Sequence, residues 1–248
     1  MAKKEPSYFV PGYHLEFSNH LVDKLLDAIQ RAEVYHEPQK CTNFGFHVAS
    51  PSALKLSAEV KMFILQTERL ILRDFQPGHF DAFFATTNDP EYQQFYAEEE
   101  MTRPFWQKIF THILEGTTET PRTSYQLAIC LSDGTLIGTC GVRTEDALNQ
   151  QASFGCAIGR PFWGHGYATE ACRALFEFAF TQLSIHRIYA DTKAKNGRAR
   201  ALAEQLGMQL EGILRETQFF RGVWWDTAVY SILKNEWNTR KQDADKRR

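Results

Sequence analysis

The sequence predicts a mixed α/β fold, of the α+β kind, in which a mostly antiparallel central sheet is flanked by helices. Short apolar runs of strand length follow one another from Tyr125 to Ile158, and two of them are joined by Asp133-Gly134, a pair typical of tight hairpins. Apolar residues then recur at helical spacing from Ala168 to Leu183. Further strand and helix patterns follow that helix, which makes the predicted sheet a mixed one.

Each predicted strand or helix is supported by a local residue pattern. Apolar runs of strand length predict the strands, Pro77-Gly78 and Pro104 suit the first turn of a helix, and Gly207 suits a helix C-terminus. In chain order, the predicted elements are a strand at Leu70–Leu72, a helix after Pro77-Gly78, a helix from Pro104 to about Leu114, strands at Tyr125–Leu131, Leu136–Arg143 and Ser153–Ile158, a helix at Ala168–Leu183, a strand at Arg187–Thr192, a helix at Arg198–Leu206, and two strands around Arg221-Gly222.

Composition and charge narrow the classes of partner. The chain has 248 residues, and its 28 lysines and arginines against 30 aspartates and glutamates give a formal net charge of −2. Sequence-independent phosphate binding needs excess positive charge, so neither nucleic acid nor an anionic membrane surface is expected as a partner. No apolar run approaches the ~18 residues of a membrane span, and the start MAKKEPSYFV has no signal-peptide pattern. We expect a cytoplasmic protein that binds small molecules or proteins.

The cysteines do not form a recognisable metal or disulfide pattern. Their number is odd and no CxxC pair occurs: Cys41, Cys130, Cys140, Cys156 and Cys172. This pattern fits neither a disulfide framework nor a zinc site, so no metal is expected. Small buried side chains in a reducing compartment are the simpler interpretation.

The chain divides into three parts. Residues 1–62 form an N-terminal extension with one amphipathic helix pattern, which begins at Ser18 or Asn19. A lone amphipathic helix must pack on something, either the main domain or a partner such as a second copy of the chain in a homodimer. Residues 63–237 form the main domain, and the charged tail 238–248 is expected to be solvated or frayed.

The segment GRPFWGHGYATEA, residues 159–171, carries most of the chemical information. Gly164 and Gly166 let backbone N–H groups approach a ligand, and the helix that follows adds its positive dipole end. That combination predicts a phosphate or pyrophosphate site. The segment has neither a Gly-Lys-Ser/Thr sequence nor a G-x-G-x-x-G sequence, so ATP and NAD are poor candidates. A tight strand-to-helix connection that uses glycine only for its geometry is the alternative.

The same segment resembles motif A of the GNAT superfamily of N-acetyltransferases, and PFWGHGYATEA is similar to its RimJ/RimL branch, which acetylates protein N-termini. Three more segments resemble that branch in the right order: QTERLILRDF (Gln66–Phe75), Asn196–Met208 and Glu211–Leu233. The resemblance covers roughly residues 65–235. It implies a GNAT fold, with a sheet that is splayed between the fourth and fifth predicted strands, and acetyl-CoA as the co-substrate without a metal.

The resemblance also implies where acetyl-CoA is held. The pyrophosphate would rest on the motif A loop and the pantetheine arm along the fourth strand, near Cys156 and Ile158. Asn196 would hydrogen-bond the pantetheine and contribute to catalysis. The loop residues are Gly164, His165, Gly166, Tyr167, Ala168 and Thr169.

Three positions depart from the branch pattern. Pro161 stands where a Gln or Arg is common, with Arg160 one residue earlier. Ala199 stands where a Ser is the candidate proton donor to the leaving thiolate, and Ser153 stands where a carboxylate is common. The obvious general base and acid are therefore absent.

Glu145, in the loop after the third strand, is the candidate base, although a solvated charge is the simpler interpretation. Glu170 is in the first turn of a helix, where a carboxylate suits the dipole.

The resemblance implies direct transfer of the acetyl group from acetyl-CoA to a primary amine, with a protein N-terminus as the expected acceptor. Two alternatives stay open. One is a small amine acceptor, such as a polyamine or an antibiotic. The other is a non-catalytic acyl-CoA-binding sensor or scaffold, which the changes at Ser153 and Ala199 favour. Cys156 is not expected to carry the acetyl group, because no His or Asn stands nearby in the sequence to activate it.

Overall fold

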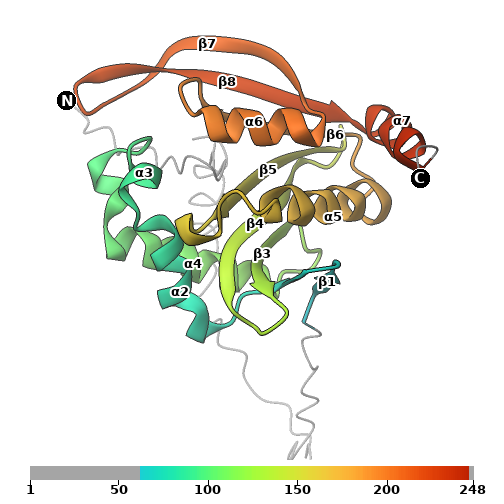
Figure 1. The fold of residues 1–248 in the computed structure, drawn as a ribbon, viewed down its shortest axis with the longest axis horizontal. Coiled ribbons are helices and arrows are strands. Elements are labelled where there is room, and N and C mark those ends of the chain that lie inside the picture. Colours follow the sequence, from blue (N-terminus) through green and yellow to red (C-terminus); the bar gives the residue numbers. More distant parts are fainter. Residues whose placement is uncertain (1–61, 246–248) are drawn as a thin grey trace, which may run out of the picture. The chain divides into compact units, whose positions relative to one another are not determined.

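The computed structural model describes residues 62–245, which form an eight-stranded sheet flanked by helices (Figure 1). The strand order is β1-β2-β3-β4-β5-β6-β8-β7, and β5 with β6 is the one parallel pair of this sheet. This confirms the predicted mixed, mostly antiparallel fold. The strands are β1 (Ile64–Gln66), β2 (Leu70–Asp74), β3 (Ser124–Leu131), β4 (Leu136–Asp146), β5 (Gln151–Ile158), β6 (Arg187–Lys193), β7 (Gln209–Phe220) and β8 (Val223–Leu233).

Helices cover both faces of the sheet (Figure 1). Successive side chains of a strand point to opposite faces. In β3, accordingly, Leu127 and Ile129 pack in one apolar cluster, and Ala128 and Cys130 in the other. The first cluster includes α5 and the second includes α2 and α4. The helices are α2 (Phe80–Thr87), α3 (Pro90–Gln93), α4 (Arg103–Gly116), α5 (Tyr167–Gln182), α6 (Gly197–Leu206) and α7 (Lys234–Asp245), with short 3-10 turns η1 (Pro77–His79), η2 (Glu98–Met101) and η3 (Arg160–Phe162).

The sheet opens between β5 and β6. The two strands pair only from Gln151–Ser153 of β5 to Arg187–Tyr189 of β6, and beyond these residues they diverge. These are the fourth and fifth predicted strands, so the expected splay is confirmed. The divergence leaves one side of each strand end without a neighbouring strand, and this gap positions the site described below.

The structure also differs from the sequence prediction in places. β4 continues through Asp146, so Glu145, which was predicted in the loop after this strand, lies within the strand. The tail expected to fray is helical as far as Asp245, and its side chains are exposed from Asn238 to Gln242. The predicted helix pattern that begins at Ser18 or Asn19 lies outside the described residues. None of the described helices is both long and apolar enough to cross a membrane.

Candidate active site

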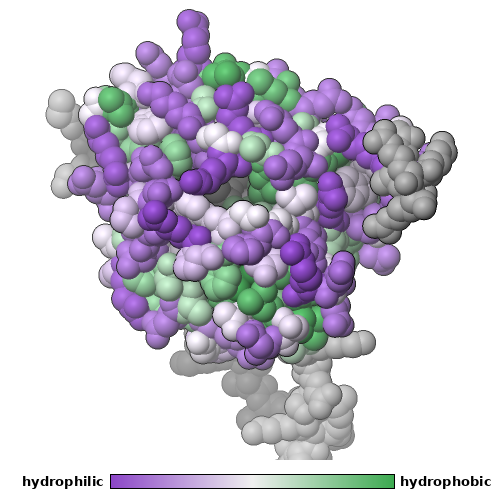
Figure 2. Space-filling view, in the orientation of Figure 1, coloured by the Kyte–Doolittle hydropathy of each residue, from purple (hydrophilic) through white to green (hydrophobic). Residues whose placement is uncertain are grey.

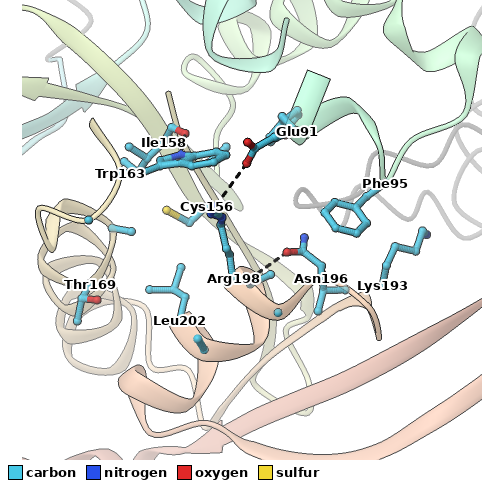
Figure 3. Close-up of a pocket in the computed structure, with 18 of the residues that line it drawn as sticks. Glu91, Phe95, Cys156, Ile158, Trp163, Thr169, Lys193, Asn196, Arg198 and Leu202 are labelled. Carbon is cyan, nitrogen blue, oxygen red and sulfur yellow. Dashed lines mark hydrogen bonds and ion pairs between the residues drawn. The ribbon is translucent and has the colours of Figure 1, made fainter. Parts of the chain in front are cut away.

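A cavity of about 870 Å³ lies where β5 and β6 diverge (Figure 3). Its walls come from the end of β5 and the following loop, the first turn of α5, the end of β6, the first turns of α6, and α3. Figure 3 shows Thr169 at one end, Cys156 near the middle, and Lys193 and Phe95 at the other end. A cavity of this size accommodates a ligand as large as a coenzyme.

The loop between β5 and α5 is shaped by two glycines. Gly164 and Gly166 both have φ of +79°, a conformation that L-residues adopt only with strain. Gly166 is the residue that precedes the first turn of α5, and its carbonyl accepts the backbone N–H of Glu170 at 3.1 Å. The first N–H groups of a helix have no partner within the helix, so this turn presents donors and a positive dipole end to the cavity.

Glu170 ties that turn to the neighbouring strands. Its carboxylate accepts hydrogen bonds from the Thr67 hydroxyl at 2.6 Å, the Arg69 backbone N–H at 3.0 Å and Arg69 Nε at 2.6 Å. Burial raises the pKa of Glu170, but these hydrogen bonds outweigh that effect and lower the pKa below its ordinary value. The carboxylate is therefore engaged in holding this turn against Thr67 and Arg69, in addition to the place in the first turn of a helix that the sequence predicted.

His165 does not line the cavity. Its ring stacks beside Tyr167, with ring centroids 5.6 Å apart, and its backbone carbonyl accepts a hydrogen bond from Arg69 Nη1 at 3.1 Å. The described contacts of His165 are therefore with Tyr167 and Arg69. The other residues expected to hold the co-substrate all line the cavity: Cys156, Ile158, Gly164, Gly166, Tyr167, Ala168, Thr169 and Asn196.

Asn196 lies at the start of α6, on the opposite wall. Its Oδ1 atom accepts the backbone N–H of Ala199 at 3.2 Å, so the side chain caps the helix. The cap uses the carbonyl oxygen, and the amide NH₂ group supplies two donors on the cavity side. Asn196 can thus fix α6 and bind a ligand at the same time.

Glu145 is not brought to the cavity. It lies beside the start of β5, because Thr144 pairs with Ala152 and Asp146 with Gln151. Its carboxylate accepts hydrogen bonds from Arg143 Nε at 2.9 Å and from the Ser153 hydroxyl at 2.5 Å. The cavity is at the other end of β5, at Cys156 to Ile158. The structure therefore gives Glu145 an ion-pairing role and no access to a substrate in this cavity.

Glu91 of α3 links the two walls of the cavity. One of its oxygens lies 3.0 Å from Arg160 Nη2, on the loop after β5, and the other lies 3.3 Å from Arg198 Nη2, on α6. The guanidinium of Arg198 also lies 4.3 Å from the centre of the Trp163 ring. Figure 3 shows Glu91 and Arg198 reaching toward each other across the cavity. Arg160 precedes Pro161, which departs from the branch pattern, and its guanidinium forms an ion pair with Glu91.

Lys193 is a site residue that sequence reasoning missed. It is the last residue of β6, lines the cavity, and is only 2% exposed. Burial lowers the pKa of Lys193 to about 7, although the charge of Glu100 acts in the opposite direction. Burial also raises the pKa of Glu100 to about 7, against the hydrogen bond it accepts from the backbone N–H of Ala97 at 2.9 Å.

Comparison with known families identifies the fold and its chemistry. The family model described as "Acetyltransferase (GNAT) domain" matches residues 69–209. "Uncharacterized N-acetyltransferase p20" of Bacillus licheniformis is 32% identical over 181 residues, which are 71% of this chain and 99% of that protein. The chain belongs to the GNAT family of acetyltransferases. GNAT acetyltransferases use acetyl-CoA, and the cavity lies where the GNAT resemblance predicts its binding.

Other GNAT relatives differ in the acceptor that their names give. "Putative ribosomal N-acetyltransferase YdaF" of Bacillus subtilis is 35% identical over 111 residues, 45% of this chain and 61% of that protein. Spermidine N(1)-acetyltransferase of Vibrio cholerae is 28% identical over 107 residues, 43% of this chain and 62% of that protein. The solved structure of spermidine N-acetyltransferase from Vibrio cholerae with CoA and spermine shares the fold, with a TM-score of 0.60, 20% identity, and coverage of 69% of this chain and 99% of that chain.

The described residues of the GNAT site do not form a cluster that could bind a metal ion. Within residues 62–245 no three His, Cys, Asp or Glu side chains are grouped so that they could hold a metal ion.

Ala199 lines the cavity and has no hydroxyl to donate. The buried thiols of Cys140 and Cys172 lie near Cys156, and burial raises the pKa of both well above its ordinary value. Such thiols stay protonated and unreactive.

Proposed function

We propose that this GNAT acetyltransferase transfers the acetyl group of acetyl-CoA directly to a primary amine, and that the acceptor is the N-terminal amine of a protein. The observation that carries the first part is the cavity between β5 and β6, which has the N-terminus of α5 at one end and buried titratable groups at the other. The pyrophosphate would bind the backbone N–H groups from Gly166 to Thr169. The thioester would then lie between the diverging strands, near Cys156.

The residues present suit this co-substrate. A β-carbon added at Gly166 would meet only Arg69 Nη2, at 3.6 Å, so the backbone of the loop is open to a phosphate. The NH₂ group of Asn196 would donate to the amide carbonyls of the pantetheine arm. Backbone N–H groups at the end of β5 would polarise the thioester carbonyl as the amine attacks, because a strand edge without a neighbour leaves such donors available.

The surface beside the acceptor end supports a protein acceptor. The β7–β8 hairpin adjoins this end, since Phe95 of the cavity wall packs edge-on against Trp225, with ring centroids 6.1 Å apart. Large apolar side chains of this hairpin are exposed, and Figure 2 shows hydrophobic groups there among hydrophilic ones. They are Leu210, Ile213, Leu214, Phe219, Val223 and Trp224. An exposed apolar surface beside a site favours a macromolecular ligand over a small polar amine.

Acetylation of competing acceptors tests this function. The protein is incubated with acetyl-CoA and an equimolar mixture of a lysine-free peptide with a free N-terminus, the same peptide with a blocked N-terminus, and spermidine. We expect thiol release, with the acetyl group found by mass spectrometry on the free peptide N-terminus. Acetylation of spermidine alone would support the small-amine alternative. Binding of acetyl-CoA without thiol release, with any acceptor of a wider amine panel, would support the sensor alternative.

Direct transfer makes a separate prediction for Cys156. The thiol lines the cavity, where the described residues include no histidine, and the one carboxylate, Glu91, is paired with Arg160 and Arg198. We expect Cys156→Ala to keep the turnover number within about threefold of wild type, and initial-rate patterns to be sequential. Ping-pong patterns together with loss of activity in Cys156→Ala would show that an acetyl-cysteine intermediate forms.

A further inference from the structure

Transfer to an ammonium group requires a base, and the cavity offers few. Glu91 is the one carboxylate among the described residues that line it. Its two oxygens face the guanidinium groups of Arg160 and Arg198, at 3.0 and 3.3 Å. Both oxygens of this carboxylate are therefore engaged in ion pairs across the cavity. Glu145, the sequence candidate, is on the other end of β5.

The other titratable groups of the cavity are less suitable than Lys193. Burial raises the pKa of Tyr92 far above its ordinary value, so its phenol keeps its proton. Tyr167 lies at the loop where the pyrophosphate would bind. Lys195 is exposed, with its Nζ atom 5.4 Å from the centre of the Trp225 ring. Lys195 therefore lines the cavity from the solvent side, whereas Lys193 is only 2% exposed.

Lys193 is placed differently from these groups. It ends β6 at the point where the sheet has opened, and it lies at the end of the cavity opposite Thr169 (Figure 3). Its Nζ atom is 5.4 Å from the centre of the Phe220 ring, and the charge of Glu100 acts on it. An ammonium taken out of water into such surroundings is destabilised, which favours the neutral amine.

We infer that Lys193 is the general base of the transfer, a catalytic residue whose neutral amine takes a proton from the ammonium of the acceptor. This inference rests on the proposed function. The acceptor nitrogen then attacks the thioester carbon, a C–N bond forms, and the C–S bond breaks. The second proton lost by the nitrogen ends on the leaving thiolate, which departs as the free thiol of CoA. Lys193 returns its proton to water before the next turnover, so atoms and charges balance.

Glu100 supports Lys193 in this reaction as a positioning residue. Its carboxyl group favours the charged form of Lys193, so it stabilises the lysine ammonium just after the proton has moved. Removing that charge in Glu100→Gln is expected to lower the pH at which Lys193 titrates. The inflection of the pH–rate profile is then expected to move to lower pH, while an effect on folding alone would leave it in place.

The titration of Lys193 is measured first on the protein alone. Lysines labelled with ¹³C at Cε are followed by NMR as the pH is changed, and Lys193→Met identifies the signal of residue 193. We expect that signal to titrate close to pH 7, well below the pKa of about 10.4 of a lysine in water. Titration of every lysine near pH 10 would overturn the inference. This readout does not depend on acetyl-CoA or on the acceptor.

Kinetics then test the role. With the acetyl acceptor found above, we expect Lys193→Met to lower kcat by about 10² to 10³-fold, the range of a lost general base. Lys193→Arg keeps a charge but cannot lose a proton, so it is expected not to restore the rate. Trimethylamine, a base that forms no stable amide, is expected to restore part of the activity of Lys193→Met. Lys108→Met, an exposed lysine of α4, is the matched control with unchanged kcat.

The outcomes separate this inference from the proposed function. Met has nearly the volume of Lys without its charge, so Lys193→Met is expected to fold and to bind acetyl-CoA with a Kd within about threefold of wild type. Normal thiol release by Lys193→Met, with an unchanged pH profile, would overturn the role of Lys193 and leave the proposed function intact. Failure of the wild-type protein to bind acetyl-CoA would overturn both.

Discussion

Replacing Gly166 with aspartate is expected to weaken acetyl-CoA binding about 100-fold, because the new carboxylate would stand where the pyrophosphate is proposed to bind. Like charges brought together at a binding site cost several kcal/mol, and 100-fold corresponds to about 2.7 kcal/mol. Isothermal titration calorimetry of the variant and the wild-type protein with acetyl-CoA measures the change. The effect is expected to diminish as salt is added, since the repulsion is partly screened.

Two matched variants isolate the charge from the backbone strain. Gly166→Asn introduces a side chain of the same shape without the charge, and is expected to lose much less affinity. Gly134→Asp places the same side chain at another glycine with positive φ, +88°, in the turn between β3 and β4. It is expected to bind like wild type. Equal affinities of Gly166→Asp and Gly166→Asn would contradict a pyrophosphate at this position.

Phe83→Ala is expected to lower the free energy of unfolding by about 3–5 kcal/mol, the cost of removing a large buried aromatic side chain. Phe83 is fully buried in the cluster between the sheet and the helices α2 and α4. Its ring lies 5.4 Å from the Phe75 ring, 5.7 Å from the Trp106 ring and 5.3 Å from the Phe110 ring, measured between centroids. Urea unfolding followed by circular dichroism measures the change.

Phe84→Ala, one residue further along α2, is the control for this change. Phe84 is only partly buried, and it packs against Phe80 and Arg103 at the surface of the same cluster. We expect a smaller loss, about 1–2 kcal/mol, because less apolar area is exposed to water. A loss in Phe83→Ala no greater than that in Phe84→Ala would show that this cluster does not carry the stability attributed to it.

The fold was predictable from local patterns to a large extent. Apolar runs of strand length predicted β2, β3, β4, β5 and β6, and the change to helical spacing at Ala168 predicted α5. Gly207 does end α6 with a positive φ of +86°. These features were accessible because they depend on residues that are close in sequence. Short elements such as β1 and α3 were missed, since three or four residues show no recognisable period.

The residues expected to hold the co-substrate, including Asn196 on the opposite wall, could be placed from the sequence, but those at the acceptor end of the cavity could not. The loop from Gly164 to Thr169 combines its glycines and its helix start within a few residues, so its chemistry was visible in the sequence. The acceptor side depends on tertiary packing. Lys193 is buried with Glu100 in its surroundings, a residue more than 90 positions earlier, and nothing near Lys193 in the sequence indicates that burial. The position of Glu145 could not be predicted for the same reason, because the register of β4 with β5 decides at which end of the sheet it lies.

A crystal structure of the protein with acetyl-CoA tests the proposed site most directly. We predict pyrophosphate oxygens about 3 Å from the backbone nitrogens of the loop between Gly166 and Thr169. The pantetheine arm is predicted to run between β5 and β6, with the thioester on the Lys193 side of Cys156. Acetyl-CoA bound with its pyrophosphate away from the start of α5, or with its thioester directed away from Lys193, would contradict the proposed site and the base inferred within it.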